Sequence, residues 1–144
     1  MSKKEEVRIL NESFKNARMG CRSIHTLLPK IYDEEFAYEL NCEADVFDKI
    51  SKKAAVELKK RGVKPEDLPR MVHLMTWASI QRKTLLNTST SHMADMMIQG
   101  NVKGMTELMQ AGHAIKKSGT VGIELAQELM EFEEKNIEKL KRYL

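Results

Sequence analysis

The chain has 144 residues, 42% of them hydrophobic and 31% charged, and its formal net charge of +3 comes from 24 basic and 21 acidic residues. This composition is typical of a single globular domain with a real core, and it excludes a disordered chain. The positive excess is small and not gathered into a block, so we expect no nucleic-acid partner. No run of about 18 apolar residues exists, so we expect no membrane span.

The expected location follows from the first residues and the cysteines. The N-terminal stretch MSKKEEVRILNESF lacks the apolar core of a signal peptide. Cys21 and Cys42 have no metal-binding spacing and fall near apolar positions of predicted helices. We interpret both as buried free thiols and expect a cytoplasmic protein.

Two amphipathic helices are predicted before residue 63. Along each, apolar residues recur at steps of three and four, as in the helices of a bundle. Pro29 weakens the end of the first helix, Asp33 can cap the second, and Gly62 suits the position after its end. The first stripe is Leu10, Phe14, Ala17, Cys21, Ile24, Leu28 and Ile31, and the second is Phe36, Leu40, Glu43, Phe47, Ile50, Ala54 and Leu58.

A linker and a third helical stretch follow. VKPEDLP at 63–69 places two prolines around an acidic pair and predicts the linker. The third stretch begins near Arg70 and runs past Gln99, and its stripe contains Met71, Met75, Ala78, Leu85, His92 and Met96.

Helical character resumes from Val102 to Lys117, with Met105, Leu108, Met109, Gly112 and Ile115 as its apolar face and a stop at 117–119. Unbroken from 70 to 117, such a helix would exceed about 70 Å, much longer than its partners. The chain must therefore bend, with Gly100 and Gly104 as the first hinge candidates and 63–77 as the second. The last helix covers about 121–143, with the stripe Ile123, Ala126, Met130, Glu133, Ile137, Leu140 and Leu144.

The fold class predicted from these elements is all-α, because no period-two strand pattern occurs. We expect one domain over 1–144, an antiparallel four-helix bundle made of a helical hairpin at 4–62, the linker 63–69 and a second helical half at 70–143. The third helix could be kinked or split.

Polar residues on the apolar stripes are the candidate site. Glu43, His92 and Glu133 stand where leucine would be expected, and Asp95 lies three residues from His92 on one helix face. If the four converge in the core, carboxylate and imidazole ligands would suit iron, manganese or zinc. Alternatively, the glutamates reach solvent at the edge of a stripe and His92 hydrogen-bonds Ser89 or another hydroxyl.

Three passages carry a resemblance to a known family: SIHTLLPKIYDEEFAYEL at 23–40, STSHMADMMIQGNVKGM at 89–105 and LAQELMEFEEKNIEKLKRYL at 125–144. With them the chain resembles the ferritin-like helical bundles, especially small Firmicute proteins of the spore-coat type. The resemblance implies a ferritin-like antiparallel four-helix bundle.

The chain departs from this family at the metal motif. A ferritin-like di-iron site uses a Glu-x-x-His motif on each of two helices, and this sequence has none. The residues three positions before His25, His73, His92 and His113 are Arg22, Arg70, Ser89 and Gln110. Iron oxidation is therefore not expected from the fold alone.

The leading functional interpretation is a non-enzymatic structural or interaction protein without a cofactor. A Met-rich stripe and the small residues Ala94, Gly100, Gly104 and Gly112 favour close helix approach, so we expect a homo-oligomer. The alternative is a metal-binding protein that uses Glu43, His92, Asp95 and Glu133. A haem or small-ligand binder with a methionine-lined core is a third, weaker interpretation.

Overall fold

The computed structural model describes residues 2–113 and 119–144, and every regular element in these ranges is helical. This confirms the predicted all-α class. No helix in these ranges combines the length and the apolar character needed to cross a bilayer. The helices are α1 (Lys3–Leu27), α2 (Glu34–Lys60), α3 (Arg70–Lys83), α4 (Thr90–His113) and α5 (Val121–Leu140), with short 3-10 turns at Leu28–Lys30 (η1) and Lys141–Tyr143 (η2).

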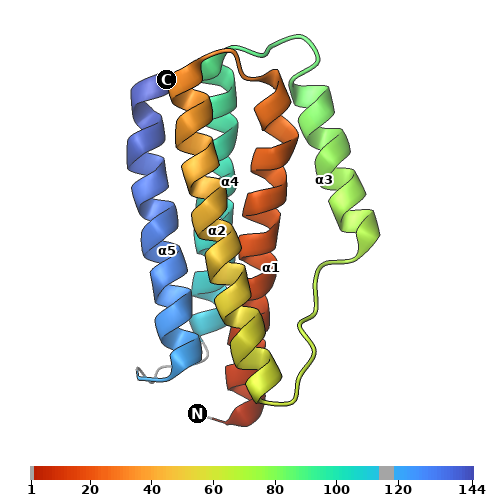
Figure 1. The fold of residues 1–144 in the computed structure, drawn as a ribbon, viewed down its shortest axis with the longest axis vertical. Helices are drawn as coiled ribbons and strands as arrows, with labels where there is room; N and C mark the ends of the chain where they lie inside the picture. Colours follow the sequence, from red (N-terminus) through yellow and green to blue (C-terminus); the bar gives the residue numbers. More distant parts are fainter. Residues whose placement is uncertain (1, 114–118) are drawn as a thin grey trace.

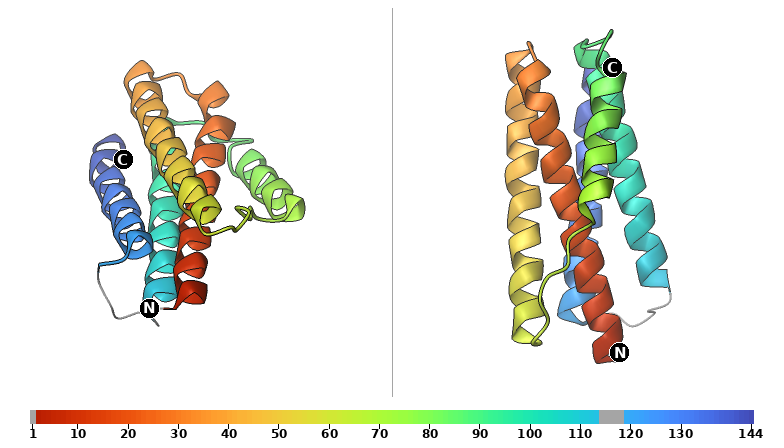
Figure 2. Two further views of the ribbon diagram at one scale, coloured as in Figure 1. Left: turned by 60° about the horizontal axis from the view of Figure 1, so that its bottom comes forward. Right: turned by 90° about the vertical axis from the view of Figure 1, so that its right-hand side faces the viewer.

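Four long helices lie side by side, and α3 lies outside them against α1 (Figure 1). α1 and α2 form one antiparallel hairpin, and α4 and α5 form a second. The segment 61–89 between the hairpins runs back along the bundle and includes α3, so α2 and α4 begin at the same end (Figure 2). The bundle thus consists of two hairpins and one long crossover.

Helix ends follow ordinary capping chemistry. Ser2 and Glu5 form a reciprocal capping box at the start of α1. The Asp33 side chain accepts a hydrogen bond of 2.8 Å from the backbone N–H of Phe36, which confirms the predicted cap of α2. Gly62 follows α2 with φ of +72°, the left-handed conformation predicted there.

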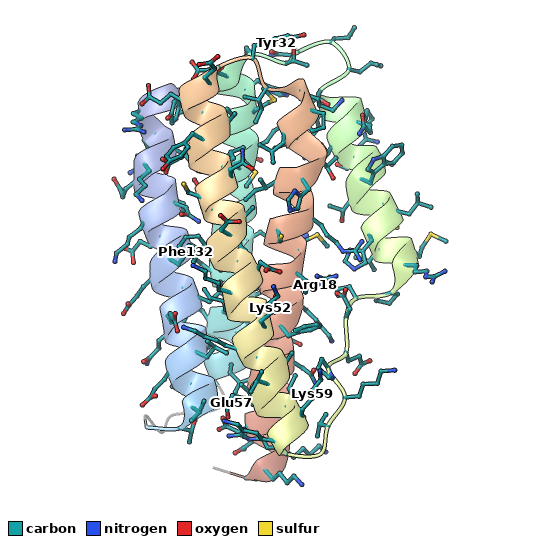
Figure 3. The ribbon with its side chains drawn as sticks, in the orientation of Figure 1. Arg18, Tyr32, Lys52, Glu57, Lys59 and Phe132 are labelled. Atoms are coloured by element: carbon teal, nitrogen blue, oxygen red, sulfur yellow. The ribbon has the colours of Figure 1, made fainter. Side chains whose placement is uncertain are left out.

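The core is built around α2, where the sequence prediction is confirmed. All residues of its predicted stripe are buried, including Glu43. The Phe47 ring lies against Gly20 of α1, where any Cβ atom would collide with it, and meets the Phe132 ring edge-on at 4.9 Å. Figure 3 shows Phe132 between α5 and α2.

In α1 and α5 the predicted stripes are rotated from the true buried face. In α1, Phe14, Cys21 and Leu28 are only half-buried, whereas Ile9 and Leu27 are fully buried. In α5, the predicted core residues Ile123, Met130 and Ile137 are only half-buried. Leu125, Leu129 and Asn136 are buried there instead. Each of these helices packs against more than one neighbour, so its buried face is wider than a single stripe. Cys42 is exposed and Cys21 half-buried, so the prediction of two buried thiols was wrong.

The third predicted stretch is split, but not at a glycine. α3 ends at Lys83, residues 84–89 form a turn, and α4 continues unbroken through Gly100 and Gly104. The hinge predictions at Gly100 and Gly104 were therefore wrong, and in the second candidate region, 63–77, only the predicted linker 63–69 is non-helical. The hydroxyl-rich residues 88–91 instead contain the start of α4, where the Ser89 side chain accepts a hydrogen bond from the backbone N–H of His92. The predicted core residue Ile115 and the predicted stop at Lys117–Ser118 lie outside the described residues.

The predicted stripe of α3 points away from the core. Met71 and Met75 are each 64% exposed, Leu85 is 77% exposed, and Ala78 is also exposed. Only Ile80 of α3 is buried. The predicted apolar residues of α3 do share one helix face, but this face points to solvent and not to the core.

Candidate functional site

The four residues predicted to bind a metal fall into two different environments. Glu43 on α2 and Glu133 on α5 are buried, with 3% and 2% of their surface exposed. His92 is half-buried in the first turn of α4, and Asp95 is exposed. Across residues 2–113 and 119–144, no three His, Cys, Asp or Glu side chains lie close enough together to hold a metal ion. The structure therefore does not assemble the predicted site.

His92 and Asp95 have local partners instead. The His92 ring nitrogen Nε2 lies 2.9 Å from the backbone oxygen of Lys83, a contact in which Nε2 donates when it carries the proton. This bond ties the end of α3 to the start of α4. Asp95 accepts a 2.9 Å hydrogen bond from Gln99, one turn along the same helix.

Glu43 is buried without a partner. Neither of its carboxyl oxygens has a hydrogen-bond partner among the described residues. Burial raises its pKa from 4.5 to about 8, and the nearby Glu39 carboxylate adds to this increase while Lys139 opposes it. At neutral pH this side chain is therefore mostly protonated, which lowers the cost of its burial.

Glu133 occupies a tight space against α4. A Cβ atom added at Gly104 would overlap the Glu133 carboxylate, so a larger residue there would force this side chain to move. Burial raises the pKa of Glu133 from 4.5 to about 9, with a further contribution from Glu107. One of its oxygens, Oε1, has no partner among the described residues.

Three amide side chains lie near this position, the buried Asn101 and Asn136 and the half-buried Asn16. Asn16 of α1 donates a 2.8 Å hydrogen bond to the backbone oxygen of Gly104. Asn136 of α5 donates to Asn101 of α4 at 3.3 Å, and Asn101 donates to the backbone oxygen of Met97 at 2.8 Å. The bonds from Asn16 to Gly104 and from Asn136 to Asn101 join different helices, so they form in only one register of α1, α4 and α5.

Sequence reasoning missed this polar layer, although one signal was available. Asn136 lies three residues after Glu133, so the two share a helix face. Asn101 has the same spacing before Gly104. The layer contains amides and a neutral acid, and it offers no nucleophile paired with a base.

α3 is fastened to α1 through a small polar cluster. Asp67 in the crossover lies 3.6 Å from Nε of Arg18 and 4.0 Å from Nη2 of Arg22, both on α1. It also lies 3.3 Å from Nε2 of His73 on α3. Figure 3 shows Arg18 on the side of α1 that faces the crossover. These contacts, together with Ile80, position α3.

The opposite side of α3 is apolar and uncovered. Met71, Leu74 and Met75 are between 57% and 64% exposed. Trp77 is 51% exposed and lies at the edge nearer α1, where it lines a pocket with His25, Pro29 and Lys30. Exposed apolar side chains gathered on one helix face are typical of a surface that binds a partner. We name Met71, Leu74 and Met75 the α3 face.

A second apolar surface lies between α4 and α5. A groove of about 220 Å³ is lined by Leu108, Met109 and Gly112 of α4 and by Ile123, Gln127 and Met130 of α5, with the buried Ile9 of α1 also contributing. We name it the α4–α5 groove. It lies on a seam that α3 does not cover.

Comparison with protein-family models, with curated proteins and with solved structures gave no match for this chain. Its function must therefore be inferred from the chain's own geometry.

Proposed function

We propose that this chain is a non-enzymatic structural or interaction protein built on a ferritin-like bundle, and that it self-associates. Two antiparallel hairpins joined by one long crossover are the connectivity of ferritin-like folds, which supports the fold assignment. Connectivity alone assigns no activity.

The α3 face is the observation that carries the proposal. α3 packs on α1 through one side and leaves methionine and leucine side chains in water on the other. Each large apolar side chain that moves from water into an interface contributes about 1.5–3 kcal/mol. Contiguous apolar surfaces of this kind mark protein contacts.

The small residues that first suggested self-association have a different role. Ala94 and Gly104 are buried within the chain, and Gly104 accommodates Glu133. Gly100 and Gly112 have open space beside them. Self-association is thus supported by exposed methionine and leucine rather than by glycine contacts. The two free cysteines fit a reducing compartment such as the cytoplasm.

Sedimentation velocity over a wide range of concentrations tests the proposal. We expect the wild-type chain to associate and the variant Met71→Glu/Met75→Glu to remain monomeric, because buried carboxylates without partners oppose the contact. Val56→Glu is the matched control, since Val56 is 51% exposed on α2. A wild-type chain that stays monomeric at every concentration would overturn the proposal.

A further inference from the structure

We infer that copies of this chain associate head to tail, with the α3 face of one copy seated on the α4–α5 groove of the next. This inference rests on the proposed self-association and specifies its geometry. It places two different surfaces of the same chain in contact.

The two surfaces match in apolar character. Beside the groove, Ile98, Val102, Met105 and Met109 follow one another on α4 at steps of four, three and four, so they share one face. Val102 and Met109 are 48% and 54% exposed. This stripe covers about 16 Å, and the α3 face, from Met71 to Met75, covers about 6 Å. The stripe is therefore long enough to seat the α3 face.

The two surfaces also carry opposite charges. α3 contains no acidic residue, and Arg70, Arg82 and Lys83 on it are all exposed.

The α5 wall of the groove carries three exposed glutamates and one exposed lysine, Lys135. Glu131 and Glu134 lie one turn beyond the groove residues Gln127 and Met130, and Glu124 lies one turn before Gln127. All three glutamates are exposed, and none belongs to an ion pair within the described ranges. Complementary charge of this kind orients partners and speeds their encounter.

Charge disfavours the simpler arrangement in which two α3 helices pair about a two-fold axis. An antiparallel pair would bring Arg70 of one copy beside Arg82 and Lys83 of the other. No acidic side chain on α3 would relieve this repulsion. A contact between two different surfaces avoids it and leaves one surface of each kind free at the ends of the assembly. Such contacts build rings or open filaments.

Two variants, each blocked on one surface, test the inference. Met71→Glu/Met75→Glu blocks the α3 face and leaves the groove intact. Met109→Lys/Gln127→Lys blocks the groove and leaves α3 intact, and both of its sites are exposed. We expect each variant alone to be monomeric by sedimentation velocity. Mixed in equal amounts, they should form a one-to-one dimer and nothing larger.

A second pair of variants tests the same contact without changing apolar residues. Arg82→Glu and Glu134→Lys alter exposed charges only. Each alone should weaken association about tenfold, and mixing the two should restore it, because both contacts between the two different variants then have opposite charges. Circular dichroism confirms that all four variants are folded.

The outcomes separate this inference from the proposed function. If the groove variant alone still associates and mixing gives no dimer, the head-to-tail geometry is wrong while self-association stands. If the wild-type chain is monomeric throughout, both the geometry and the proposed function are overturned.

Discussion

The carboxylate of Glu133 on α5 fills the space beside Gly104 on α4 so closely that a Cβ atom on Gly104 would overlap it. A buried acid and a helix-interior glycine, each unfavourable by itself, are thus explained by one contact. The amides of Asn16, Asn101 and Asn136 complete the polar layer around it.

Substitution of the glycine tests this contact. We expect Gly104→Ala to lower the free energy of unfolding by about 1–3 kcal/mol, because the added methyl group displaces a buried carboxylate. Gly100→Ala in the same helix is the control, since nothing lies within 4 Å of the added Cβ. It should raise stability by up to about 1 kcal/mol through helix propensity. Urea unfolding measures both, and equal stabilisation by both substitutions would contradict the contact.

Stability should fall as pH rises, because of the two buried glutamates. The folded-state pKa values of Glu43 and Glu133 are raised to about 8 and about 9, from 4.5. Between pH 4.5 and these values the folded state holds protons that the unfolded state has lost, so each carboxyl costs about 1.4 kcal/mol of stability per pH unit. Below pH 4.5 both states are protonated and this cost disappears.

The variant Glu133→Gln isolates one of the two contributions. We expect the decrease in unfolding free energy between pH 5 and pH 9 to be reduced, because glutamine does not titrate. Glu134→Gln is the matched control, since Glu134 is exposed on the same helix. Urea unfolding across this range gives the slopes. Identical slopes for wild type and Glu133→Gln would show that Glu133 ionises without cost.

Glu43 gives a prediction of a different kind. Its two unpartnered oxygens lie among buried residues, so Glu43→Leu should raise the unfolding free energy at pH 9 by about 4 kcal/mol more than at pH 5, since the wild-type cost accumulates up to the folded-state pKa of about 8. The gain should be smaller at pH 5, where the wild-type side chain is neutral. Glu35→Leu, at a side chain 70% exposed, should change stability by less than about 0.5 kcal/mol. Destabilisation by Glu43→Leu would mean that an unrecognised partner stabilises the carboxylate.

Trp77 is the only tryptophan of the chain and lies one turn from Leu74, at the edge of the α3 face. It is 51% exposed, so its fluorescence should be readily quenched by acrylamide at low protein concentration. As the concentration rises, quenching should decrease because the α3 face becomes covered. The variant Met71→Glu/Met75→Glu should show the same quenching at every concentration. If quenching of the wild-type chain does not depend on protein concentration, no second copy covers the α3 face.

The sequence by itself determined the helical class, the first hairpin and most of the buried face of α2, where only Ala44 and Ser51 were missed. It did so because apolar spacing of three and four residues identifies which side chains share a helix face. The caps at Asp33 and Gly62 could also be predicted, since they depend only on neighbouring residues. The stripes placed Glu43 and Glu133 among core positions but left open whether they reach solvent, and the structure buries both.

Only the tertiary structure decided which way each face points. Met71, Met75 and Ala78 share a stripe as predicted, but α3 lies outside the bundle and turns this stripe to solvent. His92 and Asp95 lie away from the buried glutamates, because the chain turns at 84–89 and starts a new helix there. Periodicity describes a single helix, whereas burial depends on its neighbours, and contacts between residues far apart in the chain place those neighbours.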